Sequence, residues 1–331
     1  MEPIASVQAL EACIGVAGLP VKMKIIDHID ETAAAWIKAA PVAFIGIGGG
    51  DGPRATLAGG EPGFASAPDR RTVVLPLSAI DAPGELSVGD GLGLLFLAPG
   101  VGETLRANGR VAAVSAREVR VRVEECFVHC AKALIRSDFW AGGPAEAPSE
   151  GADFLDASRF LALVTMDASG RIDVSPKGDP AGLLVRMDQG RATLAERPGN
   201  RLAFGYRNMI EQPKIAALAV IPGSTRTAVI RGRAQLTADE TLRSAFVVEG
   251  KTPILATVIE PDAITVGDSG ALARAGVWSR AGKAEIDAAA TLLAHIKLNK
   301  ARGAQATLMR LAVRRDLVAG GLESNYKTDL Y

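Results

Sequence analysis

The stretch Ala133-Leu-Ile-Arg136, followed by Trp140, returns 138 residues later as Ala271-Leu-Ala-Arg274, followed by Trp278. The chain has only three tryptophans, so chance is a poor explanation for this match. Upstream, residues 94–100 and the following Asn-Gly-Arg resemble residues 217–223 and a following Arg-Gly-Arg, both at a spacing of 123. Repeats at a fixed spacing are typical of a structural unit that occurs more than once. We therefore expect two tandem copies of one domain.

The length and composition give the expected domain boundaries. A chain of 331 residues corresponds to about two domains at ~150 residues each. Residues 141–152 are rich in Gly, Ala and Pro and are predicted to link an N-terminal copy (1–140) to a C-terminal copy (153–280). Residues 281–331 carry Ala/Leu-rich helical patterns and are predicted to form a helical extension.

The sequence predicts a mainly β fold with flanking helices, of the α+β class. Residues 117–123, Arg-Glu-Val-Arg-Val-Arg-Val, alternate charged residues with valine, which is the period of a half-exposed strand. Gly makes up 36 of 331 residues, well above its usual share of ~7%, so tight turns should be frequent. Between strands, residues 201–212 are predicted to form a helix with Asn200 as its N-cap.

Charge and hydropathy exclude several classes of function. Lys+Arg and Asp+Glu both number 37, so the chain lacks the basic excess of a nucleic-acid binder. Its apolar runs are far shorter than the ~20 residues of a membrane helix, and the first residues do not resemble a secretory signal. Three cysteines, an odd number, suit a reducing compartment. We expect a cytoplasmic protein with no membrane or nucleic-acid partner.

Two short basic motifs in the C-terminal copy have the chemistry of a phosphate site. They are Ser175-Pro-Lys177-Gly-Asp-Pro180 and Arg197-Pro-Gly-Asn200-Arg201, followed by Arg207-Asn208. Lysine offers a point charge, arginine offers planar pairs of donors, and a Gly-Asn turn before a helix leaves backbone N–H groups free. Two Pro-Gly turns on a solvated surface are the simpler alternative for either motif alone.

With three further stretches, these motifs resemble the pyridoxamine 5′-phosphate oxidase-related FMN-binding split-barrel family. The stretches are residues 21–29, residues 103–109 with Arg106, and residues 127–137 with His129, Lys132 and Arg136. The resemblance covers roughly residues 20–280. It implies two tandem split β-barrels that form an intramolecular pseudo-dimer, with FMN in a groove between the barrels.

The family's signatures are divided between the two copies. We expect Gly59 to stand where the C-terminal copy has Lys177, while His129 and Lys132 face Gly267 and Gly270. One groove would then gather both half-sets and bind one FMN per chain. The expected FMN ligands are Ser175, Lys177, Arg197, Asn200, Arg201, Arg207 and Asn208 from the C-terminal copy, and Arg106, His129, Lys132 and Arg136 from the N-terminal copy.

The resemblance implies an FMN-dependent oxidoreductase that takes a small-molecule substrate and a nicotinamide electron donor. A non-enzymatic flavin-binding or interaction protein is the alternative, and a haem protein with His129 on iron is a third. No motif demands a catalytic acid or base, so catalytic residues stay unassigned, and further homodimerisation stays open.

Two activities are not expected. The Cys126-x-x-His129-Cys130 motif lacks a fourth ligand nearby, so we expect no metal site. True pyridoxamine 5′-phosphate oxidases carry an Arg-x-His pair near the carboxyl end, whereas Leu293 stands two residues before His295. We therefore do not expect that oxidase reaction.

Overall fold

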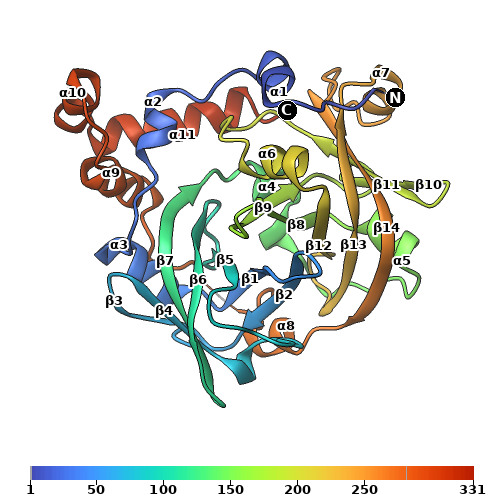
Figure 1. Cartoon of the computed structure of the whole chain (residues 1–331), viewed down its shortest axis with the longest axis horizontal. Coiled ribbons are helices and arrows are strands. Elements are labelled where there is room, and N and C mark those ends of the chain that lie inside the picture. Colours follow the sequence, from blue (N-terminus) through green and yellow to red (C-terminus); the bar gives the residue numbers. More distant parts are fainter. Residues whose placement is uncertain (1, 281) are drawn as a thin grey trace.

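The computed structural model describes residues 2–280 and 282–331, in which two antiparallel seven-stranded sheets are flanked by helices (Figure 1). The strands of the N-terminal copy are β1 (Val42–Ile47), β2 (Arg54–Gly59), β3 (Ser66–Asp69), β4 (Thr72–Pro76), β5 (Gly91–Leu97), β6 (Thr104–Val114) and β7 (Glu118–His129). Those of the C-terminal copy are β8 (Phe160–Met166), β9 (Ile172–Gly178), β10 (Val185–Asp188), β11 (Arg191–Glu196), β12 (Lys214–Val220), β13 (Arg226–Thr237) and β14 (Leu255–Asp268).

The helices lie outside the sheets and at their ends. The longer ones are α1 (Val7–Ile14), α3 (Glu31–Ala39), α6 (Phe204–Glu211), α9 (Ala288–Leu298), α10 (Ala304–Ala312) and α11 (Arg315–Thr328). Shorter ones are α2 (Leu19–Met23), α4 (Lys132–Arg136), α5 (Gly151–Ala157), α7 (Glu240–Ser244) and α8 (Gly270–Ala275), with 3-10 turns at Leu77–Ala79 and Phe139–Ala141. No helix in the described ranges is long and apolar enough to cross a membrane.

The two sheets have the same topology. The first runs β2-β1-β5-β6-β7-β4-β3, and the second, read from its other edge, runs β9-β8-β12-β13-β14-β11-β10. Each strand of the first sheet therefore has a counterpart seven strands later in the chain. This correspondence fits the predicted tandem duplication, and the two sheets confirm the predicted mainly β fold.

Strand β7, which has the clearest alternating pattern in the sequence, is half-exposed as predicted. In β7, Val119, Val121 and Val123 are buried, while Arg120 and Arg122 between them are exposed. Successive side chains of a strand point to opposite faces, so the valines enter the core and the arginines remain in solvent.

Each copy has its own hydrophobic core, and a third apolar cluster joins the copies. The third cluster packs one face of β1, including Phe44, against one face of β8, including Phe160 and Val164. The rings of Phe44 and Phe160 lie 5.2 Å apart between centroids. Burial of aromatic rings on both sides stabilises the pair of barrels as one unit, which is the predicted pseudo-dimer within a single chain.

The short helix that ends each copy docks on the other copy. Arg136, at the end of α4, donates from Nε to the carbonyl of Gly178 in β9 at 2.9 Å. Arg274 in α8 donates in the same way to the carbonyl of Gly59 in β2 at 3.2 Å. Gly178 and Gly59 are therefore equivalent positions of the two copies, and the repeat anchor seen in the sequence is a docking helix.

This equivalence corrects one detail of the sequence alignment. In the strand register, Val42 pairs with Gly59, and its counterpart Phe160 pairs with Gly178. Lys177 therefore corresponds to Ala58 and not, as predicted, to Gly59. The conclusion that the N-terminal copy lacks this lysine still holds.

The chain ends lie over the C-terminal copy and the groove (Figure 1). Near the start, the N–H of Ile4 donates to the carbonyl of Leu236 in β13, and Leu10 of α1 enters the core of the C-terminal copy. The helices after residue 287 pack beside α2 and α3, with Ile296 of α9 against Met23. This arrangement brings α2, α9, α10 and α11 next to the entrance of the groove.

Candidate functional site

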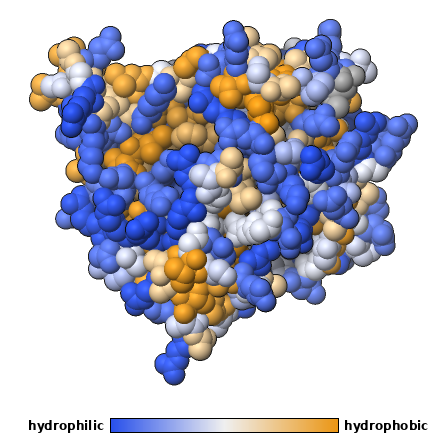
Figure 2. All heavy atoms as spheres, in the orientation of Figure 1, coloured by the Kyte–Doolittle hydropathy of each residue, from blue (hydrophilic) through white to orange (hydrophobic). Residues whose placement is uncertain are grey.

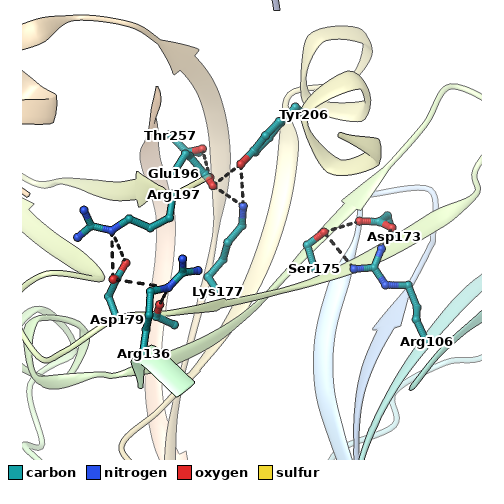
Figure 3. Close-up of polar contacts among 11 residues, drawn as sticks. Arg106, Arg136, Asp173, Ser175, Lys177, Asp179, Glu196, Arg197, Tyr206 and Thr257 are labelled. Atoms are coloured by element: carbon teal, nitrogen blue, oxygen red, sulfur yellow. Dashed lines mark hydrogen bonds and ion pairs between the residues drawn. The ribbon is translucent and has the colours of Figure 1, made fainter. Parts of the chain in front are cut away.

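A cavity of about 380 Å³ lies in the groove between the two copies. Nine of the eleven predicted ligands line it: Arg106, His129, Lys132, Arg136, Ser175, Lys177, Arg197, Asn200 and Arg201. The first four come from the N-terminal copy and the other five from the C-terminal copy. The structure thus brings the two half-sets together in one place, and Figure 3 shows part of their polar network.

Two predicted ligands lie outside the cavity wall. Arg207 pairs with Glu11 of α1 at 2.6 Å. Asn208 donates from Nδ2 to the hydroxyl of Thr165 at 3.1 Å. Both side chains bind α6 to neighbouring elements, so they are positioned to hold the helix and not to contact a ligand in the cavity.

Glu196, which the sequence analysis did not single out, is at the centre of one network in the cavity wall (Figure 3). Its carboxylate is 2% exposed and pairs with Lys177. It also accepts hydrogen bonds of 2.6 Å from the hydroxyls of Tyr206 and Thr257. Burial, together with the charge of Glu196, raises the pKa of Tyr206 well above its usual value. Lys177 is therefore already paired, although an ammonium group with three N–H donors retains capacity for a ligand.

Asp179 is the centre of a second network. Arg197 donates to its two carboxylate oxygens from Nε at 3.1 and 3.0 Å, and Arg136 lies 3.8 Å away. Burial raises the pKa of Asp179, against the opposing effect of the two arginines. One carboxylate thus serves two guanidinium groups, which leaves one positive charge unbalanced.

Arg106 connects the copies on the other side of the cavity. It is 2% exposed, pairs with Asp173 of β9 and lies 5.0 Å from the ring centroid of Phe127. Ser175 donates to Asp173 at 2.7 Å. Near this pair, burial lowers the pKa of His129 well below its usual value, and the charge of Arg106 adds to the effect. His129 is therefore neutral at pH 7.

The loop before α6 offers free donors. The Nη2 atom of Arg197 and the Nδ2 atom of Asn200 are buried without a partner in the described residues. Among the residues that the structure describes, the N–H groups of residues 199–201 find no acceptor and Arg201 finds no carboxylate partner. The helix begins later than predicted: Ala203 is the N-cap of α6, and Asn200 instead accepts from the N–H of Leu202 at 3.0 Å. The loop therefore extends by three residues beside the cavity.

The segment after α11 completes the wall. Asp329 pairs with Lys132 at 2.8 Å, and the carbonyl of Leu330 accepts from Arg136 at 2.9 Å. The ring of Tyr331 lies 5.3 Å from the guanidinium of Arg197. Nothing in the sequence pattern of these residues predicted this contact, because it depends on how the helical extension returns to the groove.

The charges around the cavity do not balance. Six cationic side chains line it, namely Arg106, Lys132, Arg136, Lys177, Arg197 and Arg201. Four carboxylates pair with them: Asp173, Asp179, Glu196 and Asp329. The excess of two positive charges matches a phosphate monoester, which carries a charge of about −1.5 to −2 at pH 7.

On the equivalent side of the pseudo-dimer, polar groups of the two copies pair with each other. Asp81 accepts from the hydroxyl of Ser269 and, at 2.8 Å, from the N–H of Ala271 at the start of α8. Arg274 donates to the carbonyl of Ala79 at 2.9 Å. The Asp81 carboxylate thus accepts from the donors at the start of α8.

One part of the chain matches a known protein family. Residues 147–275 match the family model described as pyridoxamine 5′-phosphate oxidase. The match covers most of the C-terminal copy, and the resemblance predicted from the motifs is confirmed there. No curated protein matches the sequence.

Three solved structures are among those similar to this chain. HupZ of Group A Streptococcus is 18% identical, with 38% of this chain and 98% of that chain covered at a TM-score of 0.31. General Stress Protein 26 of Bacillus anthracis is 15% identical, with coverages of 36% and 92% and a TM-score of 0.28. The FAD binding protein of Mycobacterium smegmatis is 14% identical, with coverages of 37% and 94% and a TM-score of 0.26.

Proposed function

We propose that this chain binds one FMN in the groove between its two copies and acts as a flavin-dependent oxidoreductase. The observation that carries the proposal is the excess of two positive charges around a cavity that also holds unpartnered donors of Arg197 and Asn200. A phosphate monoester would satisfy both the charge and the donors. The family match of the C-terminal copy supports a flavin as the molecule that carries this phosphate.

The residues have distinct expected roles. Arg201, Arg197 and Asn200 would hold the phosphate, and Lys177 would add one donor from its network with Glu196. Arg106, His129 and Lys132 would approach the same ligand from the N-terminal copy. The bound flavin would supply hydride and electron transfer, while the protein supplies binding, orientation and electrostatics.

The oxidation of pyridoxamine 5′-phosphate is not the activity proposed. His295 is fully buried outside the cavity, where its Nδ1 contacts the carbonyl of Lys24 at 3.2 Å. It is therefore not available to hold a substrate over a flavin.

The test is an absorption spectrum of the purified chain after incubation with FMN and removal of free flavin. A yellow chain whose flavin absorbance bleaches with NADH or NADPH supports an oxidoreductase. Retained colour that neither nucleotide bleaches supports flavin binding without this reaction. A colourless chain contradicts the proposal, and a Soret band after incubation with haemin would favour haem instead.

A further inference from the structure

A second, larger cavity adjoins the first. It has a volume of about 1050 Å³ and lies between α2 and the helices α9, α10 and α11. Its wall is mostly apolar and includes Val21, Ile296, Met309, Val318 and Leu322. Figure 2 shows hydrophobic side chains gathered on the surface over this group of helices, at the upper left.

The apolar wall is only partly covered by the chain. Leu308 of α10 is 69% exposed, Leu317 of α11 is 63% exposed and Val16 is 54% exposed, and all three line the cavity. In a water-soluble domain, large apolar side chains that are exposed around one hollow indicate a binding surface. The described residues of α11 include none that is buried, so the contact of this helix with α9 leaves its apolar side chains incompletely covered.

The two cavities meet at a positively charged boundary. Lys132, Asn200 and Arg201 line both of them. The apolar cavity has one carboxylate in its wall, Asp329, and that group already pairs with Lys132. A ligand in the apolar cavity can therefore reach the free guanidinium of Arg201.

Lys24 adds a buried cation to the apolar cavity. The residue follows α2, lines the cavity and is only 7% exposed. Within the described chain it has no carboxylate partner, and its Nζ lies 5.6 Å from the ring centroid of Phe127. A buried charge without a counter-ion is costly, so this site is matched to an anion supplied from outside the chain.

We propose that this cavity binds a small amphipathic carboxylate, with its anionic group at Lys24 and its apolar chain along α9, α10 and α11. The charge of the wall excludes a cationic headgroup, and the length of apolar surface favours an unbranched hydrocarbon chain over a compact polar molecule. The proposal goes beyond flavin binding, because Lys24 and the apolar side chains of this wall are not among the proposed FMN ligands, although Lys132, Asn200 and Arg201 line both cavities.

The pH response follows from the surroundings of Lys24. Burial lowers its pKa to about 8, Cys130 raises it and Arg106 lowers it further. The neighbouring His129 is neutral at pH 7, and His295 contacts the backbone carbonyl of Lys24 and not its amine. Lys24 is thus mostly charged at pH 7 and mostly neutral at pH 9, so carboxylate affinity should fall between these values.

The experiment is calorimetric titration of the full chain with decanoate and, as a neutral probe of the same chain length, decanol. We expect Lys24→Met to weaken decanoate at least tenfold at pH 7 and to leave decanol within twofold. Lys22→Met, a charge change two residues away that does not line this cavity, should alter neither. Equal decanoate affinity in the wild type and Lys24→Met, or no decanoate binding by the wild type, overturns the proposal.

A second variant covers the case in which Lys24→Met fails to fold. Leu317→Glu changes an exposed position of α11 and should abolish binding of both probes while the thermal unfolding temperature stays unchanged. If Leu317→Glu still binds either probe, the cavity is not the binding site. Sedimentation tests whether a second copy of the chain covers this face instead. If the wild type is a dimer that Leu317→Glu dissociates and added decanoate does not, the apolar face is a contact between copies and the proposal is overturned. FMN absorbance is recorded separately, so failure of flavin binding cannot be confused with either result.

Discussion

Arg136 of α4 reaches out of its own copy and donates a hydrogen bond to the carbonyl of Gly178 in the other copy, at 2.9 Å. The backbone of α4 lies so close to Gly178 that a Cβ atom there would collide with the carbonyl of Ala133. Gly59 meets Ala271 of α8 in the same way. The two copies are therefore held together by a reciprocal exchange of helices, and one of these contacts forms an edge of the candidate site.

Gly178→Ala should destabilise the chain. The added methyl group would force α4 away from β9, and overpacking of this kind typically costs about 1–3 kcal/mol. Urea unfolding measures the change. Gly50→Ala is the matched control, because its Cβ would meet no atom within 4 Å. If both variants lost the same stability, the close approach would not be what holds the copies together.

Arg201→Ala should weaken FMN binding by about ten- to a hundredfold. A charge-assisted hydrogen bond to phosphate is worth about 1.5–3 kcal/mol, and Arg201 has no competing partner in the described chain. Arg207→Ala removes the same side chain at a position that pairs with Glu11 outside the cavity. It should leave FMN affinity within about twofold. Titration of FMN fluorescence gives both values, and equal losses would place the phosphate elsewhere.

Lys177→Met should lower stability more than a surface substitution does, because it leaves Glu196 buried with no cation beside it. Removal of one partner of a buried ion pair typically costs about 3–5 kcal/mol. The double variant Lys177→Met/Glu196→Gln removes the stranded charge and should recover part of the loss. Arg54→Ala, whose guanidinium binds the carbonyls of Pro83 and Glu85 near the surface, is the control. Additive losses in the double variant would show that Lys177 and Glu196 are not coupled.

Asp30 should make the stability of the chain depend on pH in the acid range. Burial opposes its ionised form, but the His295 ring, whose Nε2 lies 3.4 Å away, and the hydrogen bond from the N–H of Ala33 outweigh burial and lower its pKa below the usual 3.8. A carboxyl with a lowered pKa in the folded state adds stability above its unfolded pKa. That stability is lost as the pH falls through the folded pKa. Asp30 is also the N-cap of α3, so Asp30→Ala should cost about 0.5–2 kcal/mol at pH 7.

The measurement is urea unfolding of Asp30→Ala and the wild type at pH 7 and pH 3. The difference between the two proteins should be larger at pH 7. A difference that is the same at both values would show that the charge of Asp30 contributes nothing to folding.

The sequence predicted the duplication and the shared site because both depend on local motifs. Trp140 and Trp278 mark equivalent docking segments, and the division of basic residues between the copies implied that one groove gathers both sets. The single-residue error at Gly59 arose where the two copies share almost no identity. In a strand, a slip of one residue moves a side chain to the other face, so only the hydrogen-bond register could correct it.

Other parts of the site could not be predicted from sequence. Asp179 lies within the Ser175–Pro180 motif and Glu196 directly precedes Arg197, but the pairing of these carboxylates with Arg197 and Lys177 depends on how neighbouring strands and loops fold. Asp329 reaches Lys132 across 197 residues of sequence through the path of the helical extension. Asp81 bonds to Ser269 and Ala271 on the equivalent side of the pseudo-dimer, and these residues carry no recognisable motif. Long-range contacts of this kind have no periodicity or spacing that marks them.

The stoichiometry of FMN binding tests the central claim most directly. A symmetric pair of barrels offers two grooves, and in this chain only one of them holds the proposed FMN ligands. The chain is saturated with FMN, freed of unbound flavin and denatured, and the released flavin is compared with the protein concentration. The account predicts one FMN per chain, reduced to near zero by Arg201→Ala with Arg197→Ala. Two FMN per chain, or one that survives both substitutions, would contradict it.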